Sequence, residues 1–314
     1  MDLSIIVVCY KGWEKLIACL ESLESFSGTD FSSEVIIVDN NSGDKNLEAI
    51  EKRFNKFKFI HNKVNGGYAN GCNLGFTYST GNFILILNPD TIVTEAAIGQ
   101  LLDKGRKNKN YFISSCRQLR HDGTETRPWG KFPGLNKRDK SKSSISQGSL
   151  EDLNIIYPDW VSGSLMLISR EVYNLLGGFD EDFWMYYEDV DICKRARDKG
   201  GEIALFRDIC IEHNHGGSSR TNVRITSITK TEVQKSRHLY IHKHLKGFDR
   251  IFLQTIIVAE NIITGLIACV DGLVFFFIPK LFVRVPIFFR LVRYYCTRMF
   301  TGSWVSSQSV NYKY

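Results

Sequence analysis

Several absences narrow what this 314-residue sequence can encode. Its eight cysteines include no Cys-x-x-Cys pair, so neither a zinc site nor a disulfide framework is indicated, and free thiols in a reducing compartment are expected. No Gly-x-Gly-x-x-Gly motif follows the first apolar run, which argues against a Rossmann dehydrogenase. The opening run SIIVVCY lacks the basic start and the length of a secretory signal, and none is expected.

Acidic residues are missing from the last part of the chain. No Asp or Glu follows Asp271, whereas the same stretch holds six Lys or Arg residues among many Phe, Leu, Val and Ile. A segment that is both basic and strongly apolar is typical of a surface that meets anionic lipid rather than nucleic acid. Two alternatives stay open, a solvated helix end packed on the body and an apolar face buried in a dimer.

Short apolar runs alternate with helix-like stretches in the first half of the chain. The runs lie at 4–10, 34–40, 57–62 and 82–89, and the helix-like stretches at 13–25, 43–53, 68–79 and 94–106. Apolar runs without alternation suit buried parallel strands, and strand–helix alternation predicts an α/β fold with a mostly parallel sheet. Such sheets bind ligands at the carboxyl ends of their strands.

The second half is less regular. A Lys-, Arg-, Ser- and Gly-rich stretch at 117–150 predicts a long exposed excursion. A strand is then expected at 160–169, a helix at 170–176 and another at 226–246, after which the composition turns apolar. These changes predict two domains, 1–245 and a helical extension at 246–314.

Polar residues follow the predicted strands, where a ligand is expected. Asp39 ends EVIIVD, a glycine-rich stretch occupies 65–75, and Asn88 and Asp90 lie in LNPD. A carboxylate at such a position suits a nucleoside or a hard cation, and glycine-rich amides suit a phosphate. Each has a structural alternative: an Asx turn at Asp39, a tight turn before a helix, and a strand-ending turn at LNPD.

Two further segments carry titratable side chains. The segment FWMYYEDVDIC places Glu188, Asp189 and Asp191 next to aromatic residues, whose apolar surroundings raise a carboxyl pKa toward the range of a general base. The same acids could instead complement a helix dipole. His213 follows an apolar run and could be a metal ligand or a structural histidine.

Taken in order, these segments resemble the family 2 glycosyltransferases, and in particular their bacterial rhamnosyltransferase-like branch. The resemblance covers residues 3 to 245, and GGFDEDFWMYYEDVD is its most specific part. It implies the GT-A fold, a nucleotide-binding, mostly parallel sheet flanked by helices. To this we add a membrane-associating helical extension at 246–314.

The resemblance also implies roles on the nucleotide side of the site. Asp39 would contact the nucleoside, and Asn65 and Asn73 would flank the nucleotide cleft. Asn88 stands where the family has the first acid of its Asp-x-Asp motif, which leaves fewer fixed charges on a bound cation. Lys11 stands where Asn usually follows Tyr, a second departure from the family pattern.

The remaining implied roles concern the cation and the proton. Asp90 would hold Mg²⁺ or Mn²⁺, and His213 matches a position that can complete the metal shell. Asp189, in the pair that it forms with Glu188, would be the base that takes the proton of the acceptor hydroxyl.

The implied activity is inverting, metal-dependent transfer of a sugar, with rhamnose suggested by the branch, from a nucleotide-diphosphate donor. The expected acceptor is a lipid-linked or growing cell-surface glycan, and the expected location is peripheral, on the cytoplasmic face of the bacterial inner membrane. Two alternatives remain: a sugar nucleotidyltransferase, although no glycine-rich basic loop follows the first strand, and an inactive scaffold or carbohydrate-binding subunit of a membrane assembly.

Overall fold

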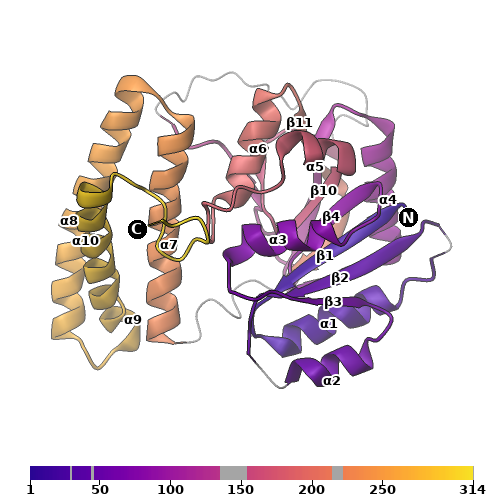
Figure 1. Ribbon diagram of the computed structural model, residues 1–314, viewed down its shortest axis with the longest axis horizontal. Coiled ribbons are helices and arrows are strands. Elements are labelled where there is room, and N and C mark those ends of the chain that lie inside the picture. The colour runs from indigo at the N-terminus through magenta and orange to yellow at the C-terminus, as the bar shows by residue number, and fades with distance from the viewer. Residues whose placement is uncertain (29, 44–45, 135–153, 214–221, 314) are drawn as a thin grey trace. The chain divides into compact units, whose positions relative to one another are not determined.

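The computed structural model describes residues 1–28, 30–43, 46–134, 154–213 and 222–313 (Figure 1). Contacts divide the chain into two compact units. The α/β unit lies within Met1–Phe132, Lys140–Asp180 and Glu188–His215, and the helical unit within Pro133–Asp139, Glu181–Tyr187 and Gly216–Tyr314.

A nine-stranded sheet forms the centre of the α/β unit, with the order β3-β2-β1-β4-β10-β6-β11-β5 and β8 paired to β11. Its first four strands run parallel: β1 (Leu3–Cys9), β2 (Ser33–Asp39), β3 (Lys58–His61) and β4 (Phe83–Leu87). The others are β5 (Thr91–Ile92), β6 (Tyr111–Leu119), β8 (Ile155–Ile156), β10 (Leu165–Ser169) and β11 (Glu202–His213). β10 runs antiparallel to its neighbours, and β7 (Trp129–Gly130) pairs with β9 (Trp160–Val161) separately.

Successive side chains of β1 point to opposite faces of the sheet and belong to two hydrophobic clusters, one on each face. Ile5 and Val7 belong to one buried cluster, and Ile6 and Val8 belong to the other. All seven residues of the strand are therefore buried, which explains an apolar run without alternation. The helices that cover the sheet are α1 (Trp13–Glu24), α2 (Asn46–Arg53), α3 (Gly67–Thr77), α4 (Glu95–Lys107), α5 (Arg170–Leu176) and α6 (Glu188–Asp198).

These elements confirm the predicted α/β fold and its strand–helix alternation. The single strand expected at 160–169 is wrong, because the chain turns at 162–165 and separates β9 from β10. In the expected excursion at 117–150, β6 continues to Leu119 and a tight turn follows at 120–123. Residues 135–150 of that excursion lie outside the described residues.

Four helices form most of the helical unit: α7 (Val223–His244), α8 (Gly247–Val274), α9 (Pro279–Phe282) and α10 (Arg284–Thr301). α7 and α8 both pack against α10. The short helix α9 lies in the connection between α8 and α10 and contacts both helices (Figure 1). α7, which the sequence-based division placed in the first domain, thus lies with the C-terminal helices. The division into domains at residue 245 itself stays a prediction.

Candidate functional site at the carboxyl ends of the strands

Asp39 is the last residue of β2 and is buried. Its carboxylate accepts the Ser42 backbone N–H, at 3.1 Å from Oδ1 and 3.3 Å from Oδ2, and His61 Nδ1 lies 3.9 Å from Oδ2. Asn41 between them has a φ of 61°, in the left-handed region that asparagine tolerates. The Asx turn considered for this segment is therefore present, and contact of Asp39 with a nucleoside stays a prediction.

Four asparagines form a hydrogen-bonded network beside Asp39. The Asn40 amide donates to Asn65 Oδ1 at 3.1 Å and to the Gly67 carbonyl at 2.9 Å. The Asn62 amide donates to Asn40 Oδ1 at 2.8 Å and to Asn70 Oδ1 at 2.7 Å. Asn65 Oδ1 also accepts the Gly67 N–H at 3.3 Å, so Asn40 and Asn65 together hold the first residue of α3. Asn62 and Asn70 were missed by sequence reasoning, although Asn62 follows β3 as Asn40 follows β2.

Asn73 is held inside the α/β unit by three hydrogen bonds. Its Oδ1 accepts the Tyr173 hydroxyl at 2.8 Å and the Phe179 N–H at 2.9 Å, and its Nδ2 donates to the Phe179 carbonyl at 2.8 Å. Asn73 thus ties α3 to the turn after α5. The structure gives this residue a positioning role, and its place beside a nucleotide stays a prediction.

Two glycines of the glycine-rich stretch serve helix packing. A Cβ on Gly71 would lie 2.6 Å from Val8 Cγ1, and one on Gly75 would lie 2.5 Å from Ile6 Cγ2. Both distances are too short for carbon atoms, so these glycines let α3 approach β1 closely. Close packing of α3 on β1 thus explains Gly71 and Gly75, and these two glycines do not require a bound phosphate.

Strand pairing brings Asp90 and His213 together, although 123 residues separate them. Asp90 directly precedes β5, His213 ends β11, and the two strands pair antiparallel with Thr91 opposite His213. His213 Nε2 lies 3.1 Å from Asp90 Oδ1. Asn88 ends up half-buried two residues before Asp90, where its backbone N–H donates to the Ser164 carbonyl at 3.0 Å.

The hydrogen bonds of His213 bear on whether a cation fits at this position. Gln118 Oε1 lies 2.8 Å from Nδ1, so a neutral imidazole that donates its proton there turns the Nε2 lone pair toward Asp90. Two acceptor atoms then face each other, an arrangement that a proton or a metal ion relieves. Neighbouring ligands of octahedral Mg²⁺ are also about 3 Å apart. The pair therefore fits two positions of a metal shell.

Lys15 on α1 is a further charged group at Asp90 and was not identified from the sequence. Its Nζ lies 3.7 Å from Asp90 Oδ2. Burial raises the pKa of Asp90, but the hydrogen bond and charge of His213 and the charge of Lys15 outweigh it, so the net pKa is lowered. Asp90 is therefore an anion at neutral pH. Among the described residues, no three His, Cys, Asp or Glu side chains gather as a metal cluster.

Glu188 and Asp189 begin α6 and differ in access to solvent. Glu188 is buried, and its Oε2 has no hydrogen-bond partner among the described residues. Asp189 is half-buried, and its Oδ2 accepts the Gly163 N–H at 3.1 Å. The Gly163 carbonyl accepts the Tyr68 hydroxyl at 2.8 Å, so α3, the β9–β10 turn and α6 meet at Asp189.

Both carboxyl groups have a raised pKa. Burial, and then the charge of Asp189, raise the pKa of Glu188 well above its ordinary range. Burial also raises the pKa of Asp189, although the N–H groups of Gly163 and Val190 favour its charged form. The third acid of the segment, Asp191, instead accepts Arg195 Nε at 2.7 Å within α6. Asp189 is thus a partly exposed residue whose carboxylate has increased basicity.

Comparison with known proteins identifies the family. A model of glycosyl transferase family 2 matches residues 4–177, more than half of the chain. The chain belongs to glycosyl transferase family 2. This confirms the resemblance, and glycosyltransferase activity follows from it.

Three curated relatives of this glycosyltransferase share 25–29% identity with it. The low-salt glycan biosynthesis hexosyltransferase Agl10 of Haloferax volcanii is 29% identical over 68% of this chain and 67% of its own length. Rhamnosyltransferase WbbL of Escherichia coli is 26% identical over 60% of this chain and 75% of its own. The N-acetylglucosaminyl-diphospho-decaprenol L-rhamnosyltransferase of Mycobacterium tuberculosis is 25% identical over 65% and 73%.

Solved structures confirm the GT-A fold. GalNAc-T7, crystallised with UDP, GalNAc and Mn²⁺, aligns over 75% of this chain with a TM-score of 0.55 at 16% identity. Residues 1–349 of TarS from S. aureus align over 77% with a TM-score of 0.52 at 17% identity. The alignment spans only 47% of the GalNAc-T7 chain and 65% of the TarS chain.

Proposed function

We propose that this family 2 glycosyltransferase inverts the configuration of the sugar that it transfers, with Asp189 as the base. The environment of Asp189 carries the proposal. The residue is half-buried and therefore partly accessible, and its carboxylate has a raised pKa and accepts the Gly163 N–H. Glu188 is buried beside it and suits a supporting role better than proton transfer with an acceptor.

One displacement accounts for inversion. The acceptor hydroxyl attacks the anomeric carbon from the face opposite the diphosphate, the bond to the diphosphate oxygen breaks, and the hydroxyl proton passes to Asp189. No covalent sugar–enzyme intermediate is needed. The six cysteines that are buried, as well as exposed Cys210 and Cys296, lie in no recognisable nucleophile motif.

The donor is proposed to be a nucleotide-diphosphate sugar held at the strand ends, with Asp39 and the asparagine network on the nucleoside side. Asp90 and His213 would hold Mg²⁺ or Mn²⁺, which supplies charge neutralisation for the leaving diphosphate when it is bound. Because two protein ligands converge there among the described residues, the donor diphosphate would complete much of the shell. Lys15 adds a positive charge on the same side.

Rhamnose is the proposed sugar, and a lipid-linked or growing cell-surface glycan is the proposed acceptor. The support is that the relatives from Escherichia coli and Mycobacterium tuberculosis are rhamnosyltransferases by name, and that the name of the second includes a diphospho-decaprenol.

Peripheral attachment to the cytoplasmic face of the inner membrane is proposed from the polarity of α8. By length and composition alone, this helix could cross a membrane. Only 11% of its most apolar 18-residue stretch is buried. Its inward face carries Gln254 and Asn261, which hydrogen-bond to His238 and Tyr295. Its outward face carries exposed apolar side chains: Ile251, Ile256, Ile263, Leu266, Ile267, Val270, Leu273 and Val274. A polar inside and an apolar outside suit hydrocarbon surroundings better than water.

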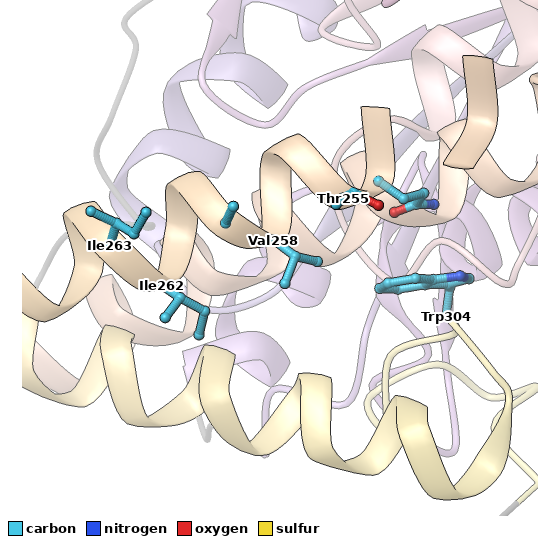
Figure 2. Close-up of a pocket in the computed structure, with 7 residues that line it drawn as sticks. Thr255, Val258, Ile262, Ile263 and Trp304 are labelled. Carbon is cyan, nitrogen blue, oxygen red and sulfur yellow. The ribbon is translucent and has the colours of Figure 1, made fainter. Parts of the chain in front are cut away.

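Other features of the helical unit also support membrane attachment through the outward face of α8. Phe275, Phe276 and Phe277 follow α8 and are all exposed. An open groove of about 550 Å³ runs beside α8, with Val258 and Ile262 on one wall and Trp304 on the other (Figure 2). Asp271, an acidic residue of α8, is paired within the unit, because its Oδ2 lies 3.2 Å from Arg284 Nη1. The four Arg side chains of α10 favour an interfacial hairpin over one that spans.

A donor screen tests the proposed reaction. Full-length protein in anionic lipid vesicles is incubated with UDP-, GDP- and dTDP-sugars, and release of the nucleoside diphosphate is measured with and without a polyprenyl-diphosphate-linked sugar. Acceptor-dependent release is expected from one donor class, with the anomeric configuration of the product opposite to that of the donor. A product of retained configuration would refute the proposed mechanism.

A further inference from the structure

The peptide Glu181–Tyr187 leads directly into α6 and therefore into Glu188 and Asp189. Its contacts nevertheless place it in the helical unit, with α7 and the segment that follows α10. Phe183 and Trp184 in this peptide are buried. The peptide that precedes the proposed base Asp189 is thus packed against α7 and the segment after α10, which are distant from it in sequence.

The end of this peptide has a strained backbone. Tyr186 and Tyr187 have φ angles of 68° and 67°, in the left-handed region that bulky residues avoid. Two such residues in succession persist only where the surroundings fix them. Ser236 of α7 supplies one restraint by donating its hydroxyl to the Met185 carbonyl at 2.8 Å, and the Tyr240 ring lies 5.8 Å from that of Tyr187.

The segment 303–313, here called the strap, holds the start of the same peptide. Ser309 Oγ donates to the Glu181 carbonyl at 2.8 Å, and Asn311 Nδ2 donates to Asp182 Oδ1 at 2.9 Å. The other oxygen of Asp182 accepts Lys243 Nζ of α7 at 2.5 Å. The peptide is therefore restrained at its start by the strap together with Lys243 of α7, and at its end by Ser236 of α7.

We propose that Ser309 and Asn311 of the strap, with Ser236 and Lys243 of α7, are positioning residues for glycosyl transfer. They hold Glu181–Tyr187 in the strained conformation that presents Asp189 to the acceptor. None of them touches the reacting atoms. The proposal rests on the function proposed above, because it takes Asp189 as the base.

Loss of the strap lets the strained φ angles relax, which moves the start of α6. A misplacement of about 1 Å at a reacting group costs on the order of 10²-fold in rate. The residues proposed for the donor lie on other elements, Asp39 on β2, Asp90 before β5 and His213 on β11. The change should therefore appear in kcat and leave the KM for the donor unaltered.

The test uses the full chain with the double substitution Ser309→Ala/Asn311→Ala. The matched control is Ser307→Ala/Gln308→Ala, because both control side chains are exposed in the same strap. Hydrogen exchange of residues 181–187 and chymotrypsin cleavage after Phe183, Trp184, Tyr186 or Tyr187 are measured without substrate. Loss of two hydrogen bonds should raise both rates about tenfold, and the control should leave them unaltered.

Kinetics with the nucleotide sugar that gives the highest turnover then separate positioning from simple packing. The double variant should lose about tenfold or more in kcat at constant donor KM, with its thermal unfolding close to that of the control. Ser309→Thr/Asn311→Gln, which retains the donor groups, should recover kcat. Unaltered exchange at 181–187 would overturn the strap itself. Faster exchange with normal kcat would overturn its role in catalysis. Because exchange needs no substrate, failure of the proposed reaction would be seen separately.

Discussion

In the sheet of the α/β unit, apolar side chains of β1, β2 and β4 lie on both faces and are buried, and polar groups gather where the strands end. In α8 of the helical unit the polarity is reversed. Gln254 is buried, whereas Ile263 is 61% exposed and Leu266 is 52% exposed. This difference is the basis for the proposal that the outer face of α8 meets hydrocarbon, whereas the sheet buries its apolar side chains within the unit.

The largest expected effect is on turnover and concerns Asp189, in the polar site at the strand ends of the α/β unit. Asp189→Asn removes the proton acceptor while its size and the donor site remain, so turnover should fall about 10²–10⁴-fold and donor affinity should not change. Turnover and donor binding by calorimetry check this.

Glu188→Gln is the matched control for Asp189→Asn. The raised pKa of Glu188 means that it tends to keep its proton, and a glutamine resembles that neutral form. Its effect on turnover should therefore be much smaller. Inactive Glu188→Gln beside fully active Asp189→Asn would show that the base has been misassigned.

The second effect concerns the cation. Asp90→Ala should weaken donor binding in Mg²⁺ or Mn²⁺ by about 10–100-fold, since it removes one of the two ligands proposed among the described residues. Excess chelator should abolish turnover of the unsubstituted protein. Lys15→Met serves as the control, because it removes charge near Asp90 but no ligand, and should retain metal dependence. Full activity in chelator would contradict the metal role.

The single acidic residues of the site could be predicted from the sequence, whereas the pairing of Asp90 with His213 could not. Asp39, Asp90 and Asp189 follow apolar runs or begin an acidic helix, and such local patterns are visible in a sequence. The partnership of Asp90 with His213 depends on β5 pairing with β11, and no local pattern reveals a pairing across 123 residues. Only the resemblance to a family suggested it.

Other residues were missed because their signal is not local. Lys15 reaches Asp90 only through the packing of α1 on the sheet. The packing role of Gly71 was also missed, because a packing glycine and a loop glycine are the same letter until the neighbouring strand is known. The strap that contacts Glu181 and Asp182 is about as far from them in sequence as His213 is from Asp90.

The third effect tests the outer face of α8. Ile263→Asp places a charge where hydrocarbon is proposed, and should reduce binding to anionic vesicles about tenfold or more. Glu260→Gln, one helical turn away and also exposed, is the control and should bind at least as well. Vesicle sedimentation measures both. High salt should weaken binding only in part, because the apolar contribution remains. Equal binding of both variants would favour a dimer face.

The smallest expected effect is the pH dependence of turnover, which sharpens the contrast between Asp189 and Asp90. A base works only when deprotonated, so kcat should rise with pH and level off above the pKa of Asp189. Because burial raises that pKa, the rise should lie above the ordinary value for Asp of about 3.9. Asp90 has the opposite shift, since His213 and Lys15 favour its charged form. Its own ionisation should therefore be complete at lower pH and should not set the position of the rise in kcat. A profile of kcat at saturating donor between pH 4 and 8 measures the rise. A kcat that is already level at pH 4 would contradict the assignment of Asp189 as the base.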